Sequence, residues 1–284
     1  MCFTQFKHTL TLEEKLDGKK SQDSNTEDKL DIKKILPVFA IVLVDLLGLT
    51  IIIPLLPLYA ASYGANAFVI GALGAAYPIM QFVGAPILGR LSDRVGRRPV
   101  LIISQIGTFV GFLILGMANT FWLLFFSRII DGISGANIAT AQAVISDNTN
   151  EKTRTQGLGL IGAAFGLGFI IGPVIAFTTL ALSDNNYNLV AFVAAGFSLI
   201  SILLTIFWLD ESYPPEKRKV NKGRTSQGFK AMLNALRKPE IGSLLTLMFF
   251  QQFALRYHMY YILLNSVSES NTRILTPRLR LLLL

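Results

Sequence analysis

Cysteine and histidine are scarce in this sequence of 284 residues, which has one of the first and two of the second. The single cysteine, Cys2, can form neither a disulfide nor a Cys-based metal site within one chain. No H-E-x-x-H motif, cysteine pair or carboxylate cluster accompanies His258 to make a metal site. The sequence also lacks a paired nucleophile and base. We therefore predict that the chain is not an enzyme and needs no metal and no cofactor.

Charged residues are scarce too, at 15%, whereas apolar residues make up 52% of the chain and the mean hydropathy is positive. A soluble domain of this length would hardly keep that balance in water, so we predict that the chain lies in a lipid bilayer. The net charge of +8 alone would also suit a nucleic-acid partner. Lys and Arg gather, however, in short segments between apolar stretches, where they indicate membrane topology. We therefore expect no nucleic-acid partner.

Several apolar stretches are long enough for transmembrane helices, which need roughly 20 residues to cross about 30 Å of hydrocarbon. They cover residues 35–60, 68–88, 100–118, 121–145, 157–182, 189–209 and 241–264. We predict an all-α integral membrane protein with a six-helix bundle at 35–209 and a partial seventh helix at 241–264. The polar residues 1–34 predict a disordered cytosolic leader.

The loops between these stretches differ in basic charge. Residues 62–68, 118–120 and 183–188 contain no Lys or Arg, whereas the turns after the second and fourth spans do. The linker at 210–240 is also basic. By the positive-inside rule, the amino terminus, the basic turns and the linker are cytosolic, in a multi-pass protein of the cell membrane.

The carboxyl-terminal residues 265–284 depart from this rule. They would lie outside the cell while containing Arg273, Arg278 and Arg280. Either the seventh helix ends early and re-enters, or the reading frame departs from the ancestral sequence near Leu255. The repetitive leucine ending favours the second explanation.

The turn at 89–101 reads GRLSDRVGRRPVL. Gly89 permits a close helix approach, and Asp93 can accept from a helix start or pair with an arginine. A generic basic turn would explain the arginines but not the spaced glycines and aspartate. The turn resembles the signature loop of the major facilitator superfamily, and that resemblance implies a latch between two helical bundles. The matching residues are Gly89, Asp93, Arg94, Gly96, Arg97 and Arg98.

The first span contains the run DLLGLTIIIPLLP, which begins at Asp45. Asp45 lies about ten residues past Ile35, hence roughly 15 Å into the membrane. An unpaired charge there is costly, so we expect this carboxyl to be protonated, paired or exposed to water. We predict a kink from Gly48, Pro54 and Pro57. The run resembles the first helix of drug/proton antiporters, including tetracycline exporters, which implies proton coupling by Asp45; a structural buried carboxylate is the alternative.

In the fourth span, Arg128 and Asp131 are three residues apart and share one helix face. If the span begins at Phe121, Asp131 lies about 15 Å deep, at the depth of Asp45. The three residues could form a proton relay, because the arginine favours ionisation of one carboxylate while the other takes the proton. A local ion pair that serves only folding is the alternative. Arg128 followed by Gly132 resembles the fourth helix of proton-coupled facilitators, although Asp131 replaces their usual neutral polar residue.

The fifth span has glycines spaced four residues apart, including Gly168 and Gly172, which favour close helix packing. Together with Pro173 they resemble the fifth-helix motif of antiporters in this superfamily. Ala176 and Phe177 stand where that motif has glycines, so the match is partial.

Polar residues also occur inside the apolar spans, among them Gln81, Gln105 and Asn137. Such residues either line a cavity, together with aromatic residues such as Tyr77, or hydrogen-bond between helices.

The resemblance covers about residues 35–255. It implies the superfamily fold, in which two six-helix halves enclose the substrate site, and this chain would supply the amino-terminal half. It also implies proton-coupled efflux of a small lipophilic or amphipathic compound, multidrug or tetracycline-like. A metabolite or anion transporter of the same fold is one alternative. A truncated, non-transporting remnant, or a half-transporter that needs a second half or another chain, is the other.

Overall fold

The computed structural model describes residues 31–135 and 137–213, together with residues 216, 238, 242–243, 246–247 and 250–251. The chain divides into two compact units, Met1–Thr225 and Ser226–Leu284. The continuous description belongs to the first unit. Most of the predicted leader, linker, seventh helix and tail lie outside the described residues.

Within 31–213 the described structure is helical and contains no strand. The helices are α2 (Ile32–Ile52), α3 (Leu56–Ser62), α4 (Ala67–Val95), α5 (Arg97–Gly116), α6 (Phe121–Ser134), α7 (Asn137–Asp147), α8 (Glu151–Leu182) and α9 (Tyr187–Trp208). Five helical stretches among the described residues are long and apolar enough to cross a membrane: α2 with α3, α4, α5, α8 and α9. This is the all-α fold that the sequence predicts.

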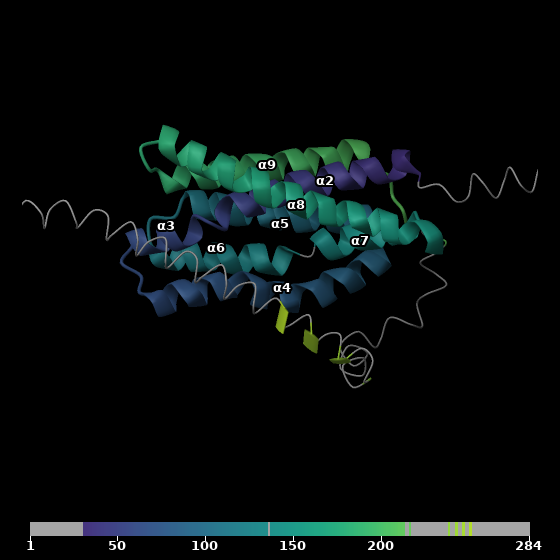
Figure 1. The fold of residues 1–284 in the computed structure, drawn as a ribbon, viewed down its shortest axis with the longest axis horizontal. Coiled ribbons are helices and arrows are strands. Elements are labelled where there is room, and N and C mark those ends of the chain that lie inside the picture. The colour runs from purple at the N-terminus through teal and green to yellow at the C-terminus, as the bar shows by residue number, and fades with distance from the viewer. Residues whose placement is uncertain are drawn as a thin grey trace, which may run out of the picture. The chain divides into compact units, whose positions relative to one another are not determined.

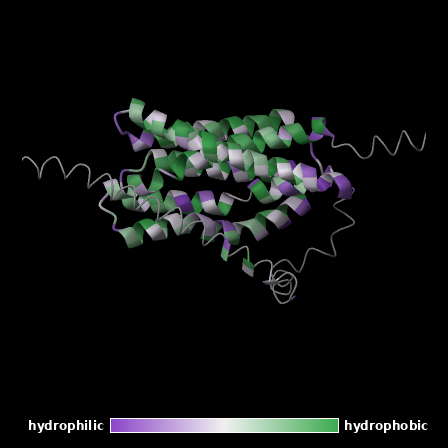
Figure 2. Cartoon of the chain, in the orientation of Figure 1, coloured by the Kyte–Doolittle hydropathy of each residue, from purple (hydrophilic) through white to green (hydrophobic). Residues whose placement is uncertain are grey.

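The helices lie side by side in one bundle. Figure 1 shows α2 and α9 along one side, α4 along the other, and α5, α6 and α7 between them. Helix α2 packs against α8 and α9, while α5 packs against α6 and α9. Hydrophobic residues make up most of the helices, and hydrophilic residues gather at helix ends and within α6 (Figure 2). Apolar residues on the outside of such a bundle face lipid or another apolar partner.

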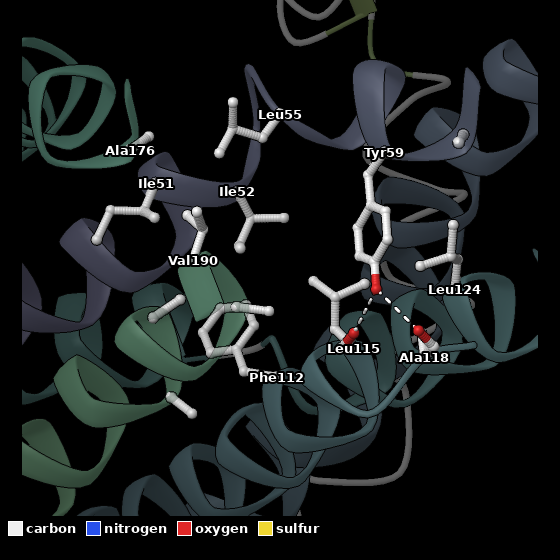
Figure 3. Close-up of a cluster of buried hydrophobic side chains, with 14 of the residues drawn as sticks. Ile51, Ile52, Leu55, Tyr59, Phe112, Leu115, Ala118, Leu124, Ala176 and Val190 are labelled. Carbon is white, nitrogen blue, oxygen red and sulfur yellow. Dashed lines mark hydrogen bonds between the residues drawn. The ribbon is translucent and has the colours of Figure 1, made fainter. Parts of the chain in front are cut away.

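The buried core consists of two hydrophobic clusters with a polar region between them. One cluster joins the end of α2 and α3 to α5, α8 and α9 around Phe112 and Tyr59. In Figure 3 the Tyr59 hydroxyl points to the end of α5, where it donates to the Ala118 carbonyl at 2.9 Å. The other cluster joins α2 to α7 and α8 around Ile41 and Val144. Asp45 lies within the α2 stretch of the second cluster, between Val42 and Leu46.

The first span is broken near its prolines. Helix α2 ends at Ile52 and α3 begins at Leu56, so Pro54 lies in the break and Pro57 in the first turn of α3. Proline is tolerated there because first-turn N–H groups have no partner within the helix. Gly48 lies inside α2, before the break, and its predicted part in the kink stays a prediction. A Cβ at this glycine would lie 3.2 Å from the Ala194 carbonyl oxygen, which makes Gly48 a site of close packing against α9.

The predicted continuous fourth span, 121–145, is interrupted. Helix α6 ends at Ser134 and α7 begins at Asn137. In Figure 1 the two helices follow one another along nearly the same line. Each is too short to span a membrane alone, and the break between them leaves polar backbone groups inside the bundle.

The glycines of the fifth span do not all pack. Gly168 and Gly172 lie against α2, where a Cβ on Gly168 would be 3.4 Å from the Leu46 Cβ and one on Gly172 would collide with Thr50. Gly162 and Gly166 have no described atom within 4 Å of such a Cβ. The close contact predicted for this helix therefore depends on Gly168 and Gly172, and α8 continues past Pro173.

Candidate functional site

A small cavity lies where α2, α4, α5, α6 and α7 meet. Its lining residues are Asp45, Leu46, Leu49, Tyr77, Thr108, Asp131, Gly135, Asn137 and Ile138. The space open to the centre of a water molecule is about 10 Å³, which is room for roughly one water. A drug-sized compound needs a pocket of several hundred Å³. The cavity therefore suits a water molecule or a proton and not an organic substrate.

Asp45 faces this cavity from α2 and is held by one side-chain hydrogen bond. Asn137 Nδ2 donates to Asp45 Oδ2 at 2.8 Å. The other carboxyl oxygen, Oδ1, is buried and has no hydrogen-bond partner among the described residues. Asn137 is the first residue of α7, so the carboxyl also lies near a helix amino terminus, whose partial positive charge favours an anion.

The break between α6 and α7 places Asn137 beside Asp45. Inside a membrane, free backbone groups are tolerated only where protein groups satisfy them. The Ser134 carbonyl accepts from the Ser104 hydroxyl, and the Gly135 carbonyl accepts from Gln81 Nε2 at 2.6 Å. The side chains of α5 and α4 thus stabilise the break.

Close packing against α4 requires glycine in this region of α6. A Cβ on Gly132 would lie 2.6 Å from the Tyr77 carbonyl oxygen and 2.7 Å from the Met80 Cβ. A side chain at this position would force α4 and α6 apart. It would thereby separate Tyr77 on α4 from Asp131 on α6, which both line the cavity. Gly132, which matches the family pattern in sequence, is therefore a packing residue of the cavity.

Arg128 and Asp131 form a buried ion pair on α6. Their side chains are 2% and 1% exposed, and Arg128 Nη1 lies 3.0 Å from Asp131 Oδ2. The guanidinium carbon lies 5.5 Å from the centroid of the Phe112 ring, within cation–π distance. Arg128 Nη2 is buried without a hydrogen-bond partner in the part of the chain that the structure describes.

The structure brings the three predicted proton-coupling residues together. Asp45 and Asp131 line the same cavity, and Arg128 pairs with Asp131 beside it. If both carboxyls are ionised, the group carries one net negative charge, which a single proton neutralises. We call Asp45, Asn137, Asp131 and Arg128 the cavity cluster.

A second polar group surrounds Arg97 at the opposite end of α5 from Gly116. The Arg97 guanidinium donates to Asp147 Oδ2 at 3.0 Å and to Asp93 Oδ1 at 2.6 Å. It also donates to the Ser92 hydroxyl at 2.7 Å and lies 5.0 Å from the centroid of the Tyr213 ring. These contacts join the ends of α4 and α7 and the segment after α9 to one side chain.

Glu211 adds to this group at the amino terminus of α5. Its carboxylate accepts from the Arg97 backbone N–H at 2.9 Å and from that of Arg98 at 3.3 Å. An acidic group at a helix start satisfies orphan N–H groups and interacts favourably with the helix dipole. We call Arg97, Asp93, Asp147, Glu211 and Tyr213 the Arg97 clasp.

The remaining residues of the predicted latch loop have separate environments. Arg98 donates through Nη2 to the Ile206 carbonyl of α9, whereas Arg94 is exposed. Gly96 has a φ of 123°, a backbone conformation that favours glycine. No described atom lies within 4 Å of a Cβ on Gly89, so the close helix approach expected at Gly89 is not found in residues 31–213.

Asn137, Asp147, Glu211 and Tyr213 belong to these groups but were missed or left unassigned by the sequence. Asn137 is one of the polar residues expected either to line a cavity or to hydrogen-bond between helices, and it does both. Gln105 only bonds another helix, through Ser201 at 2.8 Å. Asp147 and Glu211 gave one signal: each is an acid at or shortly after a helix end on the side of the basic turns.

The residues that the structure describes contain no group of three or more His, Cys, Asp or Glu side chains that could hold a metal ion. In the cavity Arg128 pairs with Asp131, and in the clasp Arg97 pairs with Asp93 and Asp147.

Comparison with known proteins identifies a family. The model of the Major Facilitator Superfamily matches residues 38–271. The tetracycline resistance protein of class B from Escherichia coli is 38% identical over 175 residues, which are 61% of this chain and 43% of that protein. Major facilitator superfamily domain-containing protein 10 from Mus musculus is 30% identical over 213 residues, 65% of this chain and 45% of that protein.

A solved structure is also similar. The crystal structure of the human organic anion transporter MFSD10 (TETRAN) aligns with a TM-score of 0.59 at 29% identity. The alignment covers 66% of this chain and 49% of the human chain. The chain spans about half the length of the curated relatives it matches.

Proposed function

This chain belongs to the Major Facilitator Superfamily, and on that premise we propose that it forms the amino-terminal half of a proton-coupled exporter of small lipophilic or amphipathic compounds. It is a multi-pass membrane protein. We place it in the cell membrane with the amino terminus in the cytosol, because the basic residues gather at one end of the bundle.

The cavity cluster is the observation that carries proton coupling. Two carboxyls and one arginine share a site with room for one water, and their net charge changes from −1 to zero when one proton binds. Asp131 is committed to Arg128, so Asp45, whose Oδ1 has no described partner, is the group that takes the proton. An opposite charge favours the ionised form of Asp131, which makes this division of roles physically consistent.

The exported compound does not fit in the cavity that the described residues line. The cavity holds about one water, so a compound must bind elsewhere, and the superfamily places its substrate site between two halves. The names of several relatives refer to tetracycline resistance, which supports a tetracycline-like or multidrug substrate. Transport then requires a second six-helix half, in the same polypeptide or in another chain.

An organic anion is the second candidate substrate. The similar human structure is described as an organic anion transporter, and the buried Arg128 offers a positive charge near the cavity. The arginine is paired with Asp131, however, and this neutralises much of its attraction for an anion. A lipophilic compound is therefore the leading candidate.

Proteoliposomes test this proposal. Sequencing the gene downstream in all three frames should reveal a second half, and the two halves are reconstituted together. We expect a pH gradient to drive tetracycline uptake and each substrate pulse to move protons. Asp45→Asn should abolish the proton movement, whereas Asp184→Asn, at an exposed loop aspartate, should leave it unchanged.

Three outcomes discriminate between the candidates. Proton flux that survives Asp45→Asn removes Asp45 from coupling. Uptake of an organic anion but not of tetracycline favours the second candidate. Absence of transport from any combination, with both halves folded, identifies a non-transporting remnant.

A further inference from the structure

Asn137 and Asp45 share one hydrogen bond and leave one oxygen each without a partner. Asn137 Nδ2 donates to Asp45 Oδ2 at 2.8 Å. Asp45 Oδ1 and Asn137 Oδ1 are both buried, and neither has a partner within the described structure. Buried polar atoms in proteins are nearly always hydrogen-bonded. These two oxygens lie on neighbouring side chains and lack a donor between them. A proton on Asp45 supplies that donor.

The chemistry of the two groups fits that place. An ionised carboxylate only accepts hydrogen bonds, so a neighbouring amide must present its NH₂ group, as Asn137 does. A protonated carboxyl donates, and the acceptor that an amide offers is its oxygen. A half-turn about the last side-chain bond of Asn137 exchanges these two groups.

We infer that Asn137 is a positioning residue that hydrogen-bonds Asp45 in both protonation states by turning its side-chain amide. This inference rests on the proposed function, in which Asp45 takes the proton. It adds a residue that the family pattern in this sequence does not single out. With Asn137 present, Asp45 can gain or lose a proton while it keeps one hydrogen bond.

Among the described lining residues, Asn137 is the one whose side chain hydrogen-bonds Asp45. Tyr77 on α4 is titratable, and its hydroxyl accepts from Gln81 at 3.3 Å. Asp131 on α6 is paired with Arg128, which is the charged group behind it. Helix α5 contributes an uncharged threonine, and among the described lining residues none comes from α8 or α9. Asn137 is the amide of the lining, and it already contacts the carboxyl.

The position of Asn137 at a helix start makes the turn of the amide inexpensive. It begins α7, after the break that follows Ser134, and its side chain makes no hydrogen bond to the α7 backbone. The backbone carbonyls of the break are satisfied by Ser104 and Gln81 instead. The amide can therefore turn without unwinding either helix.

Infrared titration of the full 284-residue chain in lipid nanodiscs measures the proton on Asp45 without requiring transport. A carboxyl C=O band that disappears with rising pH and is absent from Asp45→Asn reports this residue. Asn137→Leu has nearly the size of Asn but neither donor nor acceptor. A hydrogen bond to a carboxylate is stronger than one from a neutral acid, so its loss should move the titration midpoint about one pH unit towards higher pH.

Matched variants separate hydrogen bonding from packing. Asn137→Ser has a hydroxyl that both donates and accepts, and it should return the midpoint towards that of the parent. Asn148→Leu changes a nearby asparagine whose amide bonds the Val144 carbonyl at 2.8 Å, away from the cavity, and it should leave the midpoint unchanged. If the leucine variant does not fold, Asn137→Ala removes the same two groups and is read in the same way.

The outcomes separate this inference from the proposed function. A midpoint that is the same in Asn137→Leu and the parent, with the Asp45 band present, overturns the role of Asn137 and leaves proton coupling intact. A spectrum in which Asp45→Asn removes no titrating band overturns both. A shift that serine does not reverse indicates packing and also overturns the inference.

Discussion

The cavity cluster and the Arg97 clasp both set an arginine against two carboxyls, yet they satisfy it differently. In the clasp, the Arg97 guanidinium bonds Asp147 and Asp93 directly, and its face lies on an aromatic ring. In the cavity cluster, Arg128 pairs with one carboxylate, Asp131, and its Nη2 has no described partner; Asp45 likewise has one oxygen without a described partner. A group whose charged atoms all have hydrogen-bond partners holds its helices in place. A carboxyl that has an oxygen without a partner can accept a proton. Under the proposed function, this difference corresponds to a fixed connection at one end of the bundle and a proton-binding site in its middle.

Burial separates the two groups as well. The side chains of Arg128 and Asp131 are 2% and 1% exposed, whereas Asp93 is 46% and Asp147 20% exposed in the clasp. An exposed carboxylate that loses its partner is rehydrated by water, but a buried one is not. Removing the arginine should therefore cost more in the cavity than in the clasp.

Arg128→Leu should have the largest effect. It leaves the Asp131 carboxylate buried and unpaired, which typically lowers the free energy of unfolding by about 3–5 kcal/mol. Thermal unfolding of the purified chain in detergent, compared with the parent at the same pH, measures this loss. Adding Asp131→Asn to Arg128→Leu removes the orphaned charge and should recover a large part of it.

That double variant decides the comparison. Recovery by Asp131→Asn shows that the cost of the single variant comes from a stranded charge and not from lost packing on Phe112. If Arg128→Leu proves no more destabilising than removal of Arg97, the distinction between a buried and an exposed group is wrong.

Arg97→Ala should have an intermediate effect, about 2 kcal/mol, because hydrogen bonds to charged groups are lost but their partners regain water. Arg97→Lys keeps the charge but not the planar fork that reaches Asp147 and Asp93 together, so it should restore only part of the loss. The same unfolding measurement applies. Full recovery by lysine would mean that charge alone, and not the geometry of the guanidinium, holds the clasp.

Much of the fold could be predicted from the sequence because lipid imposes a simple length rule. The predicted spans at 68–88 and 189–209 correspond to α4 at Ala67–Val95 and α9 at Tyr187–Trp208. Charges near the ends of spans do not disturb this pattern. The shared depth of Asp45 and Asp131 also followed from the helical rise, and the two residues line one cavity.

The break in the fourth span could not be predicted, because its causes lie on other helices. The sequence from Phe121 to Ile145 is compatible with a continuous helix, since glycine is common in membrane helices. The carbonyls freed at Ser134 and Gly135 are satisfied by Ser104 and Gln81, which are distant in sequence. The partner of Asp45 was missed for the same reason. Asn137 reaches the carboxyl only because α7 starts anew.

The clasp was predicted in part. Pairing of Asp93 with an arginine was one of two expectations for that residue, and the structure has the pair with Arg97 at 2.6 Å. The acids that complete the group, Asp147 and Glu211, follow the fourth and sixth spans. A local motif cannot specify which distant helix end will meet it, so these partners required the three-dimensional structure.

The two glycines of the latch loop provide the smallest and most closely matched test. Gly96 has a φ of 123° and a ψ of 160°, a region that is essentially restricted to glycine, whereas Gly89 lies inside α4 with no described atom near its Cβ position. Gly96→Ala should lower the free energy of unfolding by about 1 kcal/mol, the lower end of the usual strain cost, because a turn can relax. Gly89→Ala should be neutral or slightly stabilising, since alanine favours a helix over glycine.

The reason for this expected difference is the clasp itself. Gly96 immediately precedes Arg97, whose backbone N–H meets Glu211, so a changed turn moves the first residue of α5 away from its partners. Measuring the unfolding midpoints of the two alanine variants side by side in one detergent checks the expected difference in stability. Equal stabilities would mean that the turn at Gly96 is not fixed by the clasp. The clasp would then be no more rigid than the cavity cluster, and the contrast between a fixed end and a titratable middle would be lost.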